Sequence, residues 1–553
     1  MIKSPLQKAR SQYIPKLPQS LEESVSLITG EASESVADQK AIKDMFPHTY
    51  GLPLVTFAPG EFSENQILNV GVVLSGGQAP GGHNVISGLF DALKKLNRKN
   101  QLYGFIGGPD GLLNNSFIEL DEDIVDEYRN TGGFDIIGSG RTKIEDEASY
   151  DLVIGNCLKN DINALVIVGG DDSNTNACVL AEYFKEKNVG IQVIGCPKTI
   201  DGDLKNDFIE TSFGFDTACK VYSELIGNIQ RDANSAKKYW HFIKLMGRSA
   251  SHISLECALK TQPNIAIISE EIEKYKLTLN KIVGQIAEIV KKRANKGENF
   301  GTVLIPEGLV EFMPSIKKLI AELNDILASK PEYYLLKTNQ EKRALITEAL
   351  SEESAKVYSS LPDSFAKQLT FDRDPHGNVQ VSKIETEKLL IDMVTDRLAK
   401  DQSFHGKFNA QNHFFGYEGR CAAPSNFDAD YCYSLGYTAA LLINAGKTGY
   451  MAFIKNTAQS SENWIAGGVP ITMMMNLERR NGDVKPVIQK ALVDLKGNPF
   501  LVFRSKRKEW ASNTSYIYPG PIQYFGPGEV CDAPSETLLL EKETLLQEEP
   551  VTV

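Results

Sequence analysis

The chain has 553 residues, of which 42% are hydrophobic and 24% are charged, a balance typical of a soluble globular protein with more than one domain. Its formal net charge of -12 argues against a nucleic-acid partner, because phosphate backbones are bound by basic surfaces. The sequence shows neither a signal-peptide core nor an apolar run of the roughly 18 residues that span a bilayer, so we predict a cytoplasmic protein with no membrane partner.

Residues 1–66 contain several prolines and show no strong hydrophobic period. We predict an N-terminal extension that packs over the main body. From Ile67 onward, short apolar runs end in glycine and are followed by helical periodicity, which is typical of parallel strands joined by crossover helices. Such runs predict an α/β protein with one large or two smaller doubly wound sheets. The seven clearest runs are ILNVGVVLSGG, QLYGFIGG, NALVIVGGDD, IQVIGCPK, HFIKLMGR, NIAIISEE and TVLIPEG.

Between about residues 311 and 405 the strand signal fades and apolar residues recur at helical spacing. We predict a mainly helical insertion here, interrupted by a short extended piece at Val379 and Val381. The chain then returns to the main body. We predict that residues 521–553 form an acidic C-terminal tail, either an edge helix or a loose segment.

Three glycine-rich loops follow predicted strands, and each is followed by sequence that can start a helix, the geometry in which loop and helix amides bind phosphate. The first loop, SGGQAPGGHN at 75–84, is on its own explained equally well by a tight turn. The second, GGDDSNT at 169–175, carries two adjacent carboxylates. They could simply cap the next helix, or Asp171 could hold Mg²⁺, which prefers carboxylate and phosphate oxygens.

The third loop, PKTIDGD, follows the strand that ends near Cys196. In an extended segment Thr199, Asp201 and Asp203 would share one face, with Lys198 starting from the other. A hydroxyl, two carboxylates and an ammonium could support phosphoryl transfer, since this chemistry needs charge stabilisation and a proton acceptor. Taken alone, the loop is as well explained by a hydrogen-bonded turn.

Together these loops resemble the phosphofructokinase family, most closely its long pyrophosphate-dependent members. GGDDSNTNA, PKTIDGD, MGR, PEG and GYEGR occur in the family's order, and the match covers roughly 67–310 and 411–446. The resemblance implies two doubly wound Rossmann-like lobes with an active site in the cleft between them. We expect a phosphoryl-donor lobe at 67–215, completed by about 421–520, and a sugar-phosphate lobe at 216–420 that carries the insertion.

By this resemblance the reaction is reversible Mg²⁺-dependent transfer from pyrophosphate to the 1-hydroxyl of fructose 6-phosphate. Asp201 is then the base that takes the hydroxyl proton, and Lys198 binds and polarises pyrophosphate. Asp171 holds Mg²⁺, and Asp203 supports the metal and the phosphoryl group. The substrate-binding residues predicted in this way are Gly77, Arg141, Thr199, Asp203, Met246, Gly247, Arg248, Glu307, Tyr417 and Arg420.

The resemblance assigns some of these residues to the phosphoryl donor and others to the sugar phosphate. Gly77 and Arg141 match positions that contact the phosphoryl donor. The MGR segment beginning at Met246 matches the sugar-phosphate site, and Glu307 matches the carboxylate that takes the sugar hydroxyls. The GYEGR segment, with Tyr417 and Arg420, matches the groups that grip the 6-phosphate.

The donor is predicted from Asp172, because ATP-using members usually carry glycine at this position. A carboxylate here would occupy the space of the nucleotide α-phosphate and repel its charge. The alternatives are an ATP-dependent phosphofructokinase and, since some family members have lost the catalytic Asp and Lys, a non-catalytic regulatory subunit.

The resemblance also implies a homodimer. In shorter bacterial relatives a neighbouring subunit contributes arginines to the 6-phosphate site. Tyr239 and Gln411 align with those arginines here, so the subunit arrangement can differ from that of the shorter relatives.

Overall fold

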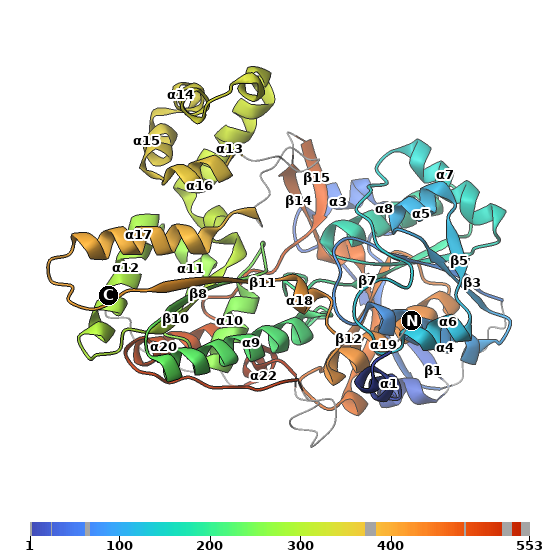
Figure 1. The fold of residues 1–553 in the computed structure, drawn as a ribbon. Coiled ribbons are helices and arrows are strands. Elements are labelled where there is room, and N and C mark those ends of the chain that lie inside the picture. The colour runs from blue at the N-terminus through green and yellow to red at the C-terminus, as the bar shows by residue number, and fades with distance from the viewer. Residues whose placement is uncertain are drawn as a thin grey trace. The chain divides into compact units, whose positions relative to one another are not determined.

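The computed structural model describes residues 3–23, 25–60, 67–370, 383–480, 483–522 and 534–543. These residues form two compact units, and Figure 1 labels many of their elements. Unit 1 comprises Met1–Val221, Tyr417–Ala491 and Ile522–Lys542, whereas unit 2 comprises Tyr222–Gly416 and Leu492–Pro521. Each unit is therefore built from segments that lie far apart in the sequence.

Unit 1 contains, within the described residues, a nine-stranded sheet with the order β1-β2-β13-β12-β7-β6-β3-β4-β5. The central strands from β12 to β4 run parallel, and antiparallel strands lie on both sides of them. Strand β6 is buried along its whole length, as expected for a parallel strand covered on both faces. The strands are β1 (Val25–Ala32), β2 (Pro53–Pro59), β3 (Asn69–Leu74), β4 (Gln101–Phe105), β5 (Phe117–Glu119), β6 (Ala164–Gly169), β7 (Gln192–Pro197), β12 (Tyr450–Lys455) and β13 (Ile465–Pro470).

Helices pack on this sheet and on one another. Two long helices, α4 and α19, meet where each carries a glycine: a Cβ added at Gly88 would lie 2.0 Å from Tyr433 O, and one added at Gly436 would lie 2.0 Å from Val85 O. Larger side chains would force these helices apart. The helices of this unit are α1 (Pro5–Ser11), α2 (Gln19–Glu22), α3 (Gln39–Met45), α4 (Gly82–Leu96), α5 (Pro109–Asn114), α6 (Glu122–Tyr128), α7 (Glu147–Lys159), α8 (Asp171–Glu186), α18 (Tyr417–Arg420), α19 (Asn426–Asn444) and α22 (Glu536–Lys542).

The N-terminal segment belongs to the sheet of unit 1, which differs from the predicted extension lying over the main body. Strands β1 and β2 pair antiparallel, and β2 continues the sheet beside β13. Arg10 is buried and donates to Asn426 Oδ1 (2.7 Å) and to Pro424 O (2.9 Å). The sequence signal was weak because β1 is largely exposed and has no regular alternation.

A buried carboxylate ties the segment between α3 and β2 to α8. Glu182 accepts hydrogen bonds from the His48 N–H (2.8 Å), the Thr49 N–H (2.9 Å) and the Thr49 hydroxyl (2.6 Å). Replacing Glu182 with Ala leaves these donors without their acceptor, which we expect to destabilise the segment locally by roughly 2–4 kcal/mol.

Hydrogen exchange of peptides covering residues 46–50 measures this loss. A single free energy of unfolding is not well defined for a chain with two units, so a local readout is preferable. Glu186→Ala, at an exposed position of the same helix, is the matched control. Equal exchange in the two variants would contradict the prediction.

Unit 2 contains, in the part of the chain that the structure describes, a four-stranded parallel sheet with the order β11-β8-β10-β9. Its strands are β8 (Trp240–Leu245), β9 (Ile265–Ala266), β10 (Gly301–Pro306) and β11 (Ala410–Phe415). The accompanying helices are α9 (Phe215–Ala236), which begins in unit 1, α10 (His252–Thr261), α11 (Ser269–Lys274), α12 (Leu279–Ala294), α17 (Thr386–Lys400) and α20 (Asn498–Ser512). The predicted α/β class is confirmed: six of the seven apolar runs form β3, β4, β6, β7, β8 and β10, and the seventh gives the two-residue strand β9.

The predicted helical insertion is also found. It consists, within the described residues, of η1 (Glu307–Phe312), α13 (Pro314–Ser329), η2 (Pro331–Leu335), α14 (Asn339–Ala349), α15 (Glu352–Ser360) and α16 (Asp363–Gln368), and α17 follows. Figure 1 shows α13 to α16 gathered in one helical group within unit 2. The apolar face of α13, from Ile316 to Leu327, packs into the unit 2 core. The predicted extended piece at Val379 and Val381 lies outside the described residues.

One predicted boundary needs correction. Residues 492–521 pack with unit 2, although the sequence analysis assigned about 421–520 to the donor lobe. Helix α20 lies against α10, α12 and β9, and Arg507 forms a two-pronged ion pair with Glu271 (2.6 and 2.9 Å). Of the predicted tail, α22 belongs to unit 1, and residues 523–533 and 544–553 lie outside the described residues.

Candidate active site

The first glycine loop follows β3 and lies against two arginines. A Cβ added at Gly77 would fall 1.4 Å from Arg420 Nη2 and 3.3 Å from Arg141 Nη2, so only glycine leaves room for these guanidinium groups. The neighbouring Gly76, at φ +85°, lies beside Lys198, whose Nζ would be 3.5 Å from an added Cβ. Two guanidinium groups and an ammonium thus gather at one loop, which is suited to a multivalent anion.

The second glycine loop runs from β6 directly into α8. The N-cap of α8 is Gly170, and Asp171 and Asp172 occupy the first turn, where negative charge is favoured by the helix dipole. The side chain of Asn174 donates to Gly169 O (2.6 Å) and to Cys196 O (3.3 Å), linking the ends of β6 and β7. The two carboxylates are therefore presented from a fixed helix start, and Asp172 is exposed.

The third loop, after β7, is a turn rather than an extended segment. The Asp201 N–H donates to Thr199 Oγ1 (3.1 Å), and Gly202 has φ +73°. The expectation that Thr199, Asp201 and Asp203 share a face through strand alternation is therefore wrong. The local hydroxyl–amide bond and the left-handed glycine bend the chain, as turn chemistry often does after a strand.

Lys198 shows that these loops are electrostatically linked. Its side chain is buried, with 7% of the residue exposed, and burial lowers its pKa to about 8. The nearby positive charges of Arg420 and Arg141 also lower this pKa, whereas Asp201 and Asp171 raise it. A phosphate bound beside Lys198 would raise this pKa again, because a nearby negative charge stabilises the charged form of the ammonium.

A residue absent from the sequence predictions, Lys490, lies among the acidic groups. Its Nζ is 3.4 Å from Asp171 Oδ2 and 3.7 Å from Asp203 Oδ2. Burial lowers the pKa of Lys490, but Asp171, Asp203, Asp172 and Asp201 together outweigh burial and raise it. Nothing in the sequence marks this lysine, since it lies in no family motif quoted above and far along the chain from its partners.

Lys490 reaches this position through a hairpin. Strands β14 (Met475–Arg480) and β15 (Asp483–Ile488) pair antiparallel. The hairpin lies against α8, and the Ile488 N–H is 3.3 Å from Thr175 Oγ1 of that helix. The segment after β15 thereby runs past the acidic loops of unit 1.

In unit 2, the predicted sugar-phosphate residues lie at the carboxyl ends of β8 and β10, which are paired in register. The buried Glu307 accepts from the Gly247 N–H (3.0 Å), and the Met246 N–H donates to Phe415 O (2.9 Å). Gly247 has φ +130°, a conformation that strongly favours glycine. The structure therefore brings Met246, Gly247 and Glu307 together.

Arg248 turns toward the start of the helical insertion. Its guanidinium binds Glu311 through two contacts of 3.1 and 2.8 Å, and nearly half of its side chain is exposed. This carboxylate was not anticipated from the sequence. A phosphate that bound here would compete with Glu311 for the same guanidinium N–H groups of Arg248.

Tyr417 and Arg420 belong to α18 in unit 1. Tyr417 is 64% exposed, and the Arg420 guanidinium lies 5.8 Å from the centre of its ring. The Arg420 Nε–H also donates to Gln78 O (3.1 Å). In unit 1 the structure thus groups Arg420 with Gly77, Arg141 and Lys198, although the resemblance linked Arg420 to the sugar 6-phosphate.

Comparison with known proteins supports what these loops suggest. The family model described as Phosphofructokinase matches residues 69–443. The chain belongs to the phosphofructokinase family.

Several relatives match nearly the whole length of this chain. A protein of Porphyromonas gingivalis named pyrophosphate–fructose 6-phosphate 1-phosphotransferase is 61% identical over 98% of this chain and 100% of its own length. One of the same name from Entamoeba histolytica is 54% identical, over 98% and 99%. The beta 1 subunit of the Arabidopsis thaliana protein of that name is 50% identical, over 97% and 94%.

A solved structure confirms the phosphofructokinase fold. The pyrophosphate-dependent phosphofructokinase of Nitrosospira multiformis superposes with a TM-score of 0.54 at 16% identity, covering 87% of this chain and 98% of its own. At that identity the likeness concerns the fold alone.

The carboxylates expected to bind Mg²⁺ fit that role in part. Among the described residues, no three His, Cys, Asp or Glu side chains are grouped to hold a metal. Asp171 and Asp203, however, already share one cation, the Lys490 ammonium. Mg²⁺ needs only one or two carboxylates when phosphate oxygens and water complete its octahedron, so this pair suits a metal that arrives with a phosphate.

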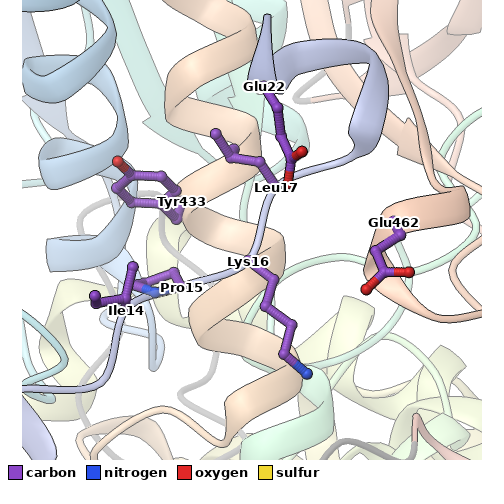
Figure 2. Close-up of a pocket in the computed structure, with 7 residues that line it drawn as sticks. All are labelled: Ile14, Pro15, Lys16, Leu17, Glu22, Tyr433 and Glu462. Atoms are coloured by element: carbon purple, nitrogen blue, oxygen red, sulfur yellow. The ribbon is translucent and has the colours of Figure 1, made fainter.

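A pocket of about 330 Å³ lies on unit 1 and contains none of the predicted site residues (Figure 2). Its lining residues are Ile14, Pro15, Lys16, Leu17, Glu22, Tyr433 and Glu462. In the described part of the chain, no helix is both long and apolar enough to cross a membrane.

Proposed function

We propose that this chain catalyses reversible, Mg²⁺-dependent phosphoryl transfer from pyrophosphate to fructose 6-phosphate, giving fructose 1,6-bisphosphate and phosphate. The relatives named above carry this activity in their names. The observation that carries the proposal for this chain is the placement of Asp171 and Asp172 in the first turn of α8. A compact diphosphate fits beside this acidic pair, whereas a nucleotide would bring its α-phosphate against Asp172.

Pyrophosphate is held, in this proposal, by the cations gathered at the first glycine loop. Lys198, Arg141 and Arg420 surround Gly76 and Gly77, whose lack of side chains lets the anion approach. Asp171, with Asp203 beside it, holds Mg²⁺, which supplies charge neutralisation to the phosphate oxygens. Charged groups positioned before the substrate arrives lower the barrier, because they need no reorganisation during the reaction.

Asp201 is proposed as the base. The sugar 1-hydroxyl transfers its proton to the Asp201 carboxylate while its oxygen forms the new bond to phosphorus, and the bond to the leaving phosphate breaks. Thr199 accepts from the Asp201 N–H and fixes the turn that carries this carboxylate. The predicted role of Thr199 in substrate binding remains a proposal.

Fructose 6-phosphate is proposed to be held by the groups at the ends of β8 and β10. Glu307, already bonded to the Gly247 N–H, accepts the sugar hydroxyls. Arg248 takes the phosphate in place of Glu311. Tyr417 and Arg420 contribute to the 6-phosphate site by family resemblance, and Arg420 would then serve both substrates.

Steady-state rates with pyrophosphate and with ATP, measured side by side on one preparation, test the proposal. We expect turnover with pyrophosphate and none with ATP. Turnover with ATP alone would establish the ATP-dependent alternative. A protein that binds fructose 6-phosphate yet is inert with both donors would be the regulatory subunit.

Asp172→Gly tests the basis of donor choice. Removing this carboxylate takes away its charge repulsion and its bulk, so we expect ATP-dependent turnover to become measurable while pyrophosphate still supports the reaction. Asp172→Asn is the matched variant, because it removes the charge and keeps the size. If neither variant uses ATP, Asp172 alone does not exclude the nucleotide.

The assembly and location of the enzyme are likewise proposals. A homodimer is expected from the family resemblance, and sedimentation of the purified protein measures its mass directly. A cytoplasmic location is expected from the sequence. Fractionation of cells that express the full chain checks it.

A further inference from the structure

Lys490 lies in a segment whose backbone is held on both sides of it. The Gln489 N–H donates to Met474 O (3.0 Å), and the Ala491 N–H donates to Asp203 O (2.7 Å). The second bond attaches the segment to the acidic loop itself. The Cα of Lys490 is therefore fixed beside Asp203, while its four-carbon side chain can still change rotamer.

The ammonium of Lys490 is shared between two loops. Its distances of 3.4 Å to Asp171 Oδ2 and 3.7 Å to Asp203 Oδ2 are both longer than the roughly 2.7–2.9 Å of a short charge-assisted hydrogen bond. The lysine side chain is 33% exposed, and the carboxylates are 20% and 9% exposed. A divalent metal held by these two carboxylates would have to displace this ammonium.

We propose that Lys490 holds the cation position between Asp171 and Asp203 in the resting enzyme and turns to the pyrophosphate oxygens when the metal-loaded donor binds. This inference rests on the proposed function, because it takes pyrophosphate as the donor. Two cations cannot share one position, since their repulsion grows steeply at short range. Lysine suits the exchange, because its flexible side chain carries three donors that can follow phosphate oxygens.

The exchange predicts opposite effects on two ligands. In Lys490→Met the side chain keeps its length and loses its charge, so the metal no longer competes with an ammonium for Asp171 and Asp203. The affinity for a divalent cation alone should rise by about fivefold or more, because a partly exposed ion pair no longer has to be broken. Pyrophosphate should bind more weakly, with a KM raised about tenfold, because it loses a charge-assisted contact.

The experiment uses the full chain and Mn²⁺ as the metal probe. Binding of Mn²⁺ without pyrophosphate is followed by the electron paramagnetic resonance of the unbound ion, and KM values are measured for pyrophosphate and fructose 6-phosphate. Lys485→Met is the control, because it makes the same change at an exposed position of the same hairpin. Lys490→Gln is measured in parallel as a second neutral variant, in case Met disturbs the segment.

Tighter Mn²⁺ binding together with a raised pyrophosphate KM, absent in Lys485→Met, supports the proposal. A general loss of structure would weaken both ligands and raise the KM for fructose 6-phosphate as well, which would overturn it. Unchanged Mn²⁺ affinity in both Lys490 variants would show that the lysine does not hold the cation position. The Mn²⁺ measurement requires no turnover, so it remains decisive if the wild type proves to use ATP and the proposed function fails.

Discussion

Replacing Asp201 with Asn is expected to lower kcat by on the order of 10² to 10⁴, because the amide cannot accept the proton of the sugar hydroxyl. The turn that positions this side chain should survive, since its bond runs from the Asp201 backbone N–H to Thr199 Oγ1 and does not involve the carboxylate. Calorimetric affinity for fructose 6-phosphate should therefore stay within about threefold of the wild type.

A matched variant separates a base from a merely structural carboxylate. Asp207→Asn, an exposed position in the same loop, should behave as the wild type. Full activity in Asp201→Asn would exclude Asp201 as the proton acceptor.

Replacing Lys198 with Met is expected to lower kcat/KM for pyrophosphate by on the order of 10² to 10³, since a buried charge aimed at a phosphate is lost. The KM for fructose 6-phosphate should change little. A comparable loss toward both substrates would indicate a disturbed fold rather than a lost donor contact.

The pH profile gives an independent test of Lys198. Because burial lowers the pKa of this ammonium to about 8, the charged form that binds pyrophosphate is complete below that pH and is lost above it. We expect kcat/KM for pyrophosphate to decline as the pH rises through 8. In Lys198→Arg the part of the decline that comes from residue 198 should be absent, because a guanidinium stays charged throughout this range.

The Lys198→Arg comparison also removes a complication. Pyrophosphate itself titrates in alkaline solution, but it does so identically in the two assays. The difference between the curves therefore reports on residue 198. Parallel declines in the two enzymes would contradict the assignment.

The strands at the centre of each sheet were predictable from the sequence. Parallel strands covered on both faces must be apolar throughout, so β6 and β10 appear as unbroken hydrophobic runs. Each run ends in a loop whose glycines and carboxylates mark the carboxyl edge of the sheet. The family resemblance then supplied roles for Lys198, Asp171 and Asp201 that remain to be tested by experiment.

Features that depend on long-range packing were not predictable. The bend at Thr199 depends on a local hydroxyl–amide bond that competes with extended structure. Lys490 reaches the acidic loops through the placement of a hairpin, and no spacing in the sequence encodes that placement. The ion pair of Arg248 with Glu311 likewise arises from how the insertion begins after β10.

The packing of Arg420 against Gly77 has a consequence for how the protein is made. These two residues are separated by most of the chain, and Lys490 follows later still, yet all three belong to one charged cluster in unit 1. A chain emerging from the ribosome lacks part of this cluster until residue 490 has been synthesised. Polypeptides that stop before residue 490 should therefore not bind pyrophosphate normally. Proteolytic removal of the residues from Tyr417 onward should abolish activity even where the remaining strands stay folded.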